Sequence, residues 1–276
     1  MNTINNFRFI IISLGSTIFT SCIGQNNGLQ DLINVNNFST IELNINNGVC
    51  DSVGYEVWNY DEDVGVKSIN IHKDFLYLTD VYHNSIKKVS IKSGNIESNI
   101  CLSKLPASES GIWLRDITVF NNKVYVTGDR DSVYVFSLDL KLEKVIPVSV
   151  GYKNIYKMSP DSLLIYLDSE QLPNLNFKYE LLLVTSDHNY SLINKIVSLN
   201  DYEKERRKTT INGEEYKLLT NSDKPFIEIP RGVIELKTEI PNIDEYGAKN
   251  IDFSKNYLIY FSSSKEKIIF YIYHFD

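Results

Sequence analysis

The sequence predicts an all-β protein built from repeated four-stranded sheets, and three observations carry this prediction. The 276 residues include 18 tyrosines and 13 phenylalanines but only two alanines, a composition that favours strands over helices. Short runs that alternate apolar and polar residues recur along the chain, separated by turn residues. Groups of these runs repeat, and the first interval between them is 48 residues.

The first group spans residues 66–102, and the second spans residues 114–150. Further groups begin at Ile155 and Ile251, so the first runs are separated by 48, 38 and 96 residues. The last interval leaves room for two units of 48 residues. Residues 205–240 fill it with strand-like runs that fit the pattern poorly.

Four-stranded units with this period predict a β-propeller of five to six blades, because a small sheet must stack radially against its neighbours to bury both faces. A β-sandwich with coincidental internal similarity is the alternative. The last group ends after its third strand, whereas residues 39–45 form an alternating run without partners of their own. We therefore expect residues 39–45 to pair with residues 267–275, complete the last blade and close the ring.

The first 21 residues have the features of a signal peptide. Residues 9–20 are largely apolar, and this run is too short to span a bilayer. Phe19-Thr20-Ser21-Cys22 resembles the lipobox of bacterial lipoproteins, which implies that Cys22 is lipidated, with palmitate among its acyl chains. Residues 22–28 would then form a tether and residues 29–276 the propeller domain. An ordinary secretory signal with a chance cysteine is the alternative.

The chain is expected to lie at the outer membrane and face the periplasm. Residues 23–28 contain no acidic residue, whereas acidic clusters after the lipidated cysteine are typical of some surface-exported lipoproteins. The net charge of −7 argues against a nucleic-acid partner. In an oxidising periplasm Cys50 and Cys101 could form a disulfide, although two buried free thiols are the simpler expectation.

The lipobox-like cysteine and the strand patterns LYLTD and VYVTG, within residues 66–276, resemble the six-bladed β-propeller lipoproteins of bacteria, which are loosely related to NHL-type propellers. The resemblance implies the fold. It does not imply an activity, because one fold hosts many functions.

Charged residues recur where a propeller would open its central channel. A basic residue stands two positions before the leading isoleucine of each first strand: Lys67, Arg115, Lys153 and Lys249. The loops between second and third strands would open on the same face, and they carry Asp80, His83, Asp129 and Asp168. We predict a funnel with a cationic inner ring and an acidic outer ring, suited to a protein partner or to an anionic or zwitterionic small ligand. In the alternative, each cation pairs with a loop carboxylate as a structural device.

Catalytic motifs are absent. The chain has no G-x-S-x-G, no H-E-x-x-H and no Gly-rich phosphate loop, and its four histidines lack zinc-ligand spacing. We therefore expect a lipid-anchored binding protein without catalysis, metal or cofactor. One competing hypothesis is a polysaccharide hydrolase or lyase with Asp80, Asp129 or Asp168 as acid and base. Another is a scaffold subunit of an outer-membrane assembly, which an exposed apolar patch would mark.

Overall fold

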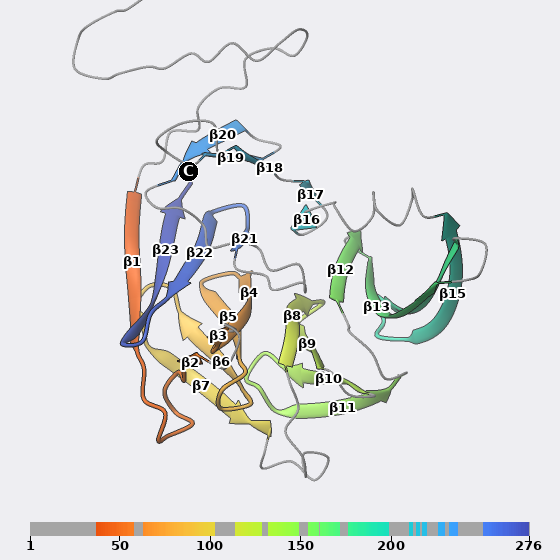
Figure 1. The fold of residues 1–276 in the computed structure, drawn as a ribbon, viewed down its shortest axis with the longest axis horizontal. Helices are drawn as coiled ribbons and strands as arrows, with labels where there is room; N and C mark the ends of the chain where they lie inside the picture. Colours follow the sequence, from red (N-terminus) through yellow and green to blue (C-terminus); the bar gives the residue numbers. More distant parts are fainter. Residues whose placement is uncertain are drawn as a thin grey trace, which may run out of the picture. The chain divides into compact units, whose positions relative to one another are not determined.

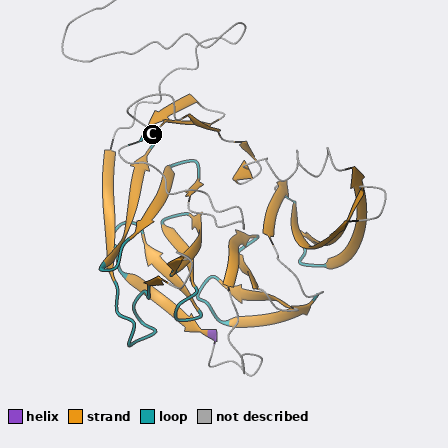
Figure 2. Ribbon diagram, viewed as in Figure 1, coloured by secondary structure: helices purple, strands orange, loops and turns teal. Residues whose placement is uncertain are grey.

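Strands and loops make up almost all of the described residues (Figure 2). The computed structural model describes residues 37–57, 63–102, 114–128, 132–148, 154–159, 161–171, 176–198, 210–211, 214–215, 217–219, 226–229, 232–236 and 251–275. Within these ranges, no helix is long and apolar enough to cross a membrane.

Three antiparallel sheets have four strands in consecutive order, as the alternating runs predicted. The first contains β4 (Val66–His72), β5 (Phe75–Asp80), β6 (Ser85–Ser90) and β7 (Ile96–Cys101). The second contains β8 (Leu114–Phe120), β9 (Lys123–Gly128), β10 (Ser132–Ser137) and β11 (Leu142–Pro147). The third contains β12 (Asn154–Ser159), β13 (Ser162–Gln171), β14 (Asn176–Thr185) and β15 (Tyr190–Ser198).

The last four-stranded sheet combines the two ends of the described chain. It contains β21 (Ile251–Phe253), β22 (Tyr257–Ser263) and β23 (Lys267–His274), with β1 (Asn37–Asn44) as the outer strand. Strand β1 runs antiparallel to β23 along its whole length (Figure 1). The expected pairing of residues 39–45 with residues 267–275 is therefore present.

Smaller elements connect the third sheet to the last one along the chain. A three-stranded sheet contains β18 (Lys217–Leu219), β19 (Phe226–Ile229) and β20 (Gly232–Glu235). Strands β16 (Thr210–Ile211) and β17 (Glu214–Glu215) form a short hairpin. Another short pair, β2 (Glu56–Val57) and β3 (Asp63–Val64), precedes the first sheet.

The sheets pack face to face on their neighbours. In β5, Leu76 and Leu78 belong to the apolar cluster shared with the last sheet, whereas Tyr77 belongs to the cluster shared with the second sheet. Further clusters join the second sheet to the third and the last sheet to β19 and β20. Each of the first, second and last sheets is therefore buried on both faces, which is compatible with the blades of a propeller.

The first strands of neighbouring sheets are also linked by polar side chains. Strands β21, β4, β8 and β12 contact one another in that order. In each contact a carboxylate or amide oxygen accepts a hydrogen bond from a backbone amide of the following sheet. These bonds run from the amide of Ile71 to Asp252, from Val119 to Asn70 and from Ile155 to Asp116. The links satisfy buried polar groups where the sheets meet.

We expected a closed ring, and the described residues do not close one. No apolar cluster among them joins the third sheet to the sheet of β18–β20. Strand β16 contacts β12, but residues 199–209, 220–225 and 237–250 lie outside the described ranges. The described strands therefore do not fix the number of blades.

Candidate functional site

Lys67 and Arg115 lie in equivalent β-bulges at the starts of β4 and β8. The pairing of β4 with β5 shifts between Val66 and Ser68, which makes Lys67 the extra residue. A corresponding shift in β8 contains Arg115. Both side chains are half-buried. Because a bulge redirects side chains at the end of a strand, the structure gives these two cations equivalent positions.

The repeated threonines of LYLTD and VYVTG close these bulges. The hydroxyl of Thr79 accepts a hydrogen bond from the Ser68 amide at 3.1 Å. In the second sheet, the hydroxyl of Thr127 accepts one from the Asp116 amide at 3.2 Å. The bulge is therefore encoded in the repeat, since each threonine compensates for a backbone pair that the extra residue disrupts.

Other predicted site positions are not described. Lys153, Lys249, Asp129 and Cys22 lie outside the described residues, and only the backbone of Asp168 is described, in β13. The proposed funnel can therefore be evaluated only at Lys67, Arg115, Asp80 and His83.

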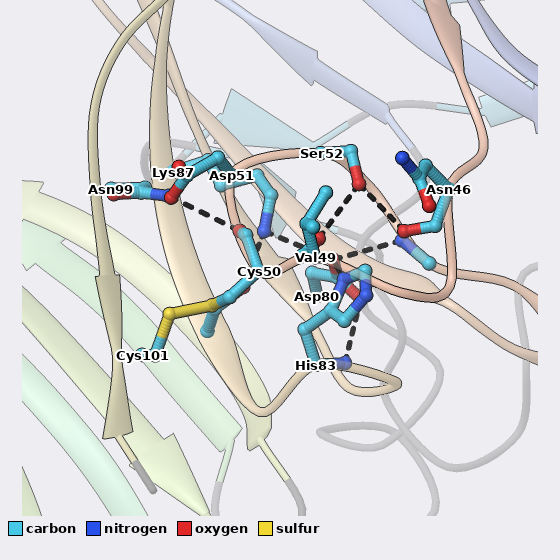
Figure 3. The surroundings of a disulfide bond; sticks show 12 residues. Asn46, Val49, Cys50, Asp51, Ser52, Asp80, His83, Lys87, Asn99 and Cys101 are labelled. Carbon is cyan, nitrogen blue, oxygen red and sulfur yellow. Dashed lines mark hydrogen bonds and ion pairs between the residues drawn. A yellow bond between two sulfur atoms is a disulfide. The ribbon is translucent and has the colours of Figure 1, made fainter. Parts of the chain in front are cut away.

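Asp80, the last residue of β5, lies inside the protein, with no exposed surface. Its Oδ2 atom accepts hydrogen bonds from Lys87 Nζ at 3.0 Å, from the Gly54 amide at 3.0 Å and from His83 Nδ1 at 2.9 Å (Figure 3). Lys87 is also fully buried, and the His83 side chain is 8% exposed. We expected Asp80 and His83 in an open funnel; the structure places both in a buried polar cluster.

The electrostatics of this cluster keep the carboxylate charged. Burial raises the pKa of Asp80, but the hydrogen bond from His83 and the charge of Lys87 outweigh burial, so the pKa lies below its usual value. Burial lowers the pKa of Lys87, although the carboxylates of Asp80 and Asp51 act in the opposite direction. Lys87 Nζ also contacts the Ser85 hydroxyl. The buried carboxylate is thus compensated by the Lys87 ammonium group and by hydrogen bonds from His83 and the Gly54 amide.

Lys87 was missed as a candidate from the sequence. It is part of the alternating run SIKKVSI, where two adjacent lysines resemble ordinary solvent-facing residues. Its position in the run could have identified it. Lys87 lies on the same face of the strand as Val89 and Ile91, which both belong to an apolar cluster. A lysine on the apolar face of a strand requires a buried counter-charge, and Asp80 is that group.

His83 has one buried ring nitrogen, Nε2, without a hydrogen-bond partner among the described residues. Because Nδ1 donates to Asp80, the neutral ring carries its lone pair on Nε2. Histidines that act as general bases or metal ligands are often held in this way, with Nδ1 donating to a carboxylate and the lone pair of Nε2 free to accept a proton or bind a metal. No described hydroxyl lies within hydrogen-bond distance, and the described residues contain no group of three or more acidic, histidine or cysteine side chains that could hold a metal ion.

A disulfide joins Cys50 to Cys101, with the Cα atoms 6.4 Å apart. Cys101 is the last residue of β7 and is buried, whereas Cys50 is half-buried in the loop that follows β1. The side-chain amide of Asn99, also in β7, donates to the Cys50 carbonyl at 3.1 Å and to Asp51 Oδ1 at 2.8 Å (Figure 3). The loop is therefore fixed to the outer strand of the first sheet.

Exposed apolar side chains concentrate on β15. Of the seven large hydrophobic residues that are exposed among the described residues, four belong to this strand: Tyr190, Leu192, Ile193 and Ile196. Tyr190 and Leu192 lie opposite Val184 and Leu182 of β14, which both face the second sheet. By alternation Ile196 shares that face. We call Tyr190, Leu192 and Ile196 the β15 stripe.

The β15 stripe lies at the outer edge of the third sheet. In the strand order β12-β13-β14-β15, no described strand pairs with the far side of β15. Lys144 Nζ, from β11, stands 4.3 Å from the ring centroid of Tyr190. The sequence reasoning missed the stripe, because alternating apolar residues in a strand predict burial unless the neighbouring sheet is known.

No protein-family model matches the chain, and no curated protein matches it. Among solved structures, the chain is similar to glutaminyl cyclase from Myxococcus xanthus, with a TM-score of 0.42 and 10% identity over 76% of this chain and 91% of that chain. It is similar to BamB from Moraxella catarrhalis, with a TM-score of 0.37 and 9% identity over 84% of this chain and 98% of that chain. It is also similar to Kuenenia stuttgartiensis hydrazine synthase, with a TM-score of 0.38 and 13% identity over 72% of this chain and 63% of that chain.

Proposed function

We propose that this chain is a lipid-anchored β-propeller that binds a protein partner and performs no chemistry of its own. The observation that carries the proposal is the β15 stripe. Its members Tyr190, Leu192 and Ile196 are 41%, 53% and 62% exposed. Neighbouring apolar side chains that stay in contact with water mark protein interaction sites, and an unpaired strand edge offers backbone donors and acceptors beside them.

The buried cluster supports binding over catalysis. A hydrolase or lyase would need funnel carboxylates that reach a substrate. Asp80, the described candidate, has no exposed surface and accepts four hydrogen bonds from the protein. Its carboxylate would have to give up these donors, and leave Lys87 uncompensated, before it could act as an acid or base.

The proposal also includes the cellular location of the protein and the closure of its sheets into a ring. We place the anchor at Cys22 and the propeller on the periplasmic side of the outer membrane, as the lipobox-like segment suggests. The successive packing of sheets, and the pairing of β1 with β23, support a propeller of five to six blades. Labelling of the expressed chain with an alkyne-bearing palmitate analogue tests the anchor, and Cys22→Ser should abolish the label.

Site-specific photo-crosslinking in the native membrane tests partner binding. A photoreactive residue at Leu192 or Ile196 should give a protease-sensitive adduct of one defined mass. Glu97 is the matched control, because it is exposed on β7, the outer strand of the first sheet. Equal adducts from all three positions, or none from the stripe, would contradict the proposal.

A second candidate function is the binding of a small anion at the funnel mouth. The equivalent bulges at Lys67 and Arg115 favour it, since they set two cations at the same level of neighbouring sheets. Citrate and glucuronate are suitable probes. Either should raise the melting temperature of the wild-type chain but not that of the Lys67→Ala, Arg115→Ala double variant. An equal rise in both proteins would remove this candidate.

A further inference from the structure

The segment that begins with β1 is attached to two different sheets. Strand β1 is the outer strand of the last sheet, and the Ile45 amide extends the pairing with a hydrogen bond to the Glu266 carbonyl at 3.0 Å. Its side chains Ile41 and Leu43 are 6% and 8% exposed, in the apolar cluster between the last and first sheets. Loss of β1 would therefore expose both the edge of β23 and part of this cluster.

The residues that follow β1 fold back against the first sheet. Val53 is fully buried in the cluster between the last and first sheets and bridges to Ile45. The Gly54 amide bonds to Asp80. A Cβ atom at Gly54 would lie 2.3 Å from the ring of Tyr82, so the backbone approaches this ring too closely for a larger residue. Cys50 lies in the loop between Ile45 and Val53, and its disulfide links this described loop covalently to β7.

We propose that the Cys50–Cys101 disulfide is a redox-sensitive latch on strand β1. A dithiol reductant cleaves the disulfide and thereby weakens the attachment of β1 to the last sheet. A reductant thiolate attacks the sulfur of Cys50, the more exposed partner, and forms a mixed disulfide. The bond to Cys101 breaks, and Cys101 leaves as a thiolate that takes up a proton. The second reductant thiol then displaces Cys50 as a thiol. The protein gains two electrons and two protons, and the reductant ends as a disulfide.

The latch acts by shortening the tether between β1 and the first sheet. With the disulfide intact, about six residues separate the end of β1 from a covalent attachment to β7. After reduction, only noncovalent contacts such as those of Val53 and Gly54 hold the loop to the first sheet, and whenever these open, about 22 residues separate the end of β1 from β4. The longer tether lowers the effective concentration of β1 at β23 by roughly fivefold to tenfold. The remaining contacts of Asn99 with the loop compete with water, because Asp51 is exposed.

Amide hydrogen exchange of the folded protein, before and after treatment with dithiothreitol, tests the latch. Complete reduction is verified by a mass increase of about 2 Da. The amides of β1 and their partners in β23 should exchange roughly tenfold faster. The amides paired between β13 and β14 are the internal control and should not change. Unchanged exchange in β1, or equal acceleration in all four sheets, would overturn the proposal.

Two variants separate the disulfide from the polar contacts around it. The Cys50→Ser, Cys101→Ser double variant should reproduce the fast exchange of the reduced protein. Asn99→Ala removes both hydrogen bonds to the loop but keeps the disulfide, and it should retain slow exchange in β1. If Asn99→Ala accelerates β1 as much as reduction does, the polar contacts hold the strand and the latch is refuted. Reduction of the folded wild-type protein provides the test even if the serine variant does not fold.

Discussion

The carboxylate of Asp252 accepts a hydrogen bond from the backbone amide of Ile71, 181 residues earlier in the chain. Asn70 donates a second bond to the same oxygen at 3.1 Å. Asp252 is fully buried, so no water replaces these donors. A polar link therefore accompanies the apolar cluster between the last sheet and the first.

Asp252→Ala should lower the free energy of unfolding by about 2–4 kcal/mol, because it leaves buried donors on β4 without an acceptor. Asp252→Asn keeps one acceptor and should cost about half as much. Urea denaturation measures both. Asp139→Ala is the control, since that side chain is 76% exposed, and it should stay within about 0.5 kcal/mol of the wild type. A loss below that value for Asp252→Ala would show that the link is dispensable.

Ile41 tests whether β1 stabilises the described fold. It is 6% exposed and lies opposite Phe270. Ile41→Ala should destabilise the protein by about 2–4 kcal/mol, through lost burial and the cavity left behind. The neighbouring Glu42→Ala removes only a 2.8 Å ion pair with Lys267 at the surface and should cost about 0–1 kcal/mol. Chemical denaturation compares the two. Similar small losses would mean that β1 packs weakly.

The Asp80 and Lys87 pair should behave as one unit. Lys87→Met leaves a buried carboxylate without its ammonium partner and should cost about 3–5 kcal/mol. Asp80→Asn, Lys87→Met together should cost less than the sum of the single changes, with a coupling energy of about 1–3 kcal/mol. Denaturation of the four proteins in a double-mutant cycle measures it. Additive losses would contradict a direct interaction.

Two tyrosines should make the protein sensitive to alkali. Burial and the charge of Asp139 raise the pKa of Tyr77 from 10.0 to about 12, and burial and Glu143 do the same for Tyr125. Since the folded-state values are raised, the unfolded chain loses these protons first. The stabilisation is complete below pH 10 and declines as the pH rises through about 12.

Tyr77→Phe tests whether the raised pKa of a buried tyrosine makes the stability of the protein depend on alkaline pH. It removes the bond to the Leu138 carbonyl and should cost about 0.5–1.5 kcal/mol at neutral pH. It should also reduce the fall in melting temperature between about pH 9 and pH 11.5. Val145→Ala, at an exposed position of β11, is the control and should leave the pH dependence unchanged. An unaltered pH dependence in Tyr77→Phe would contradict the argument.

The sequence repeat predicted much of the fold because residues that form the same local contacts recur at the same positions in each sheet. Ser68 and Asp116 occupy equivalent positions 48 residues apart, and each donates its amide to the threonine of the adjacent strand. The unpaired run at residues 39–45 likewise predicted its pairing with β23. The candidate site was less predictable, because neither the burial of Asp80 nor the position of Lys87 follows from the alternation of a single strand.

The strands of the four-stranded sheets, their order and the pairing of β1 with β23 could be predicted from the residues alone, since alternation, turn residues and edge pairing are local or nearly local properties. Which polar residues became internal depended on the packing of one sheet against another. Asp80 and Asp252 are buried because donors from other segments surround them, and the β15 stripe is exposed at the outer edge of the third sheet, where no described strand pairs with β15. Burial depends on the neighbours of a side chain, and those neighbours are set by packing between sheets.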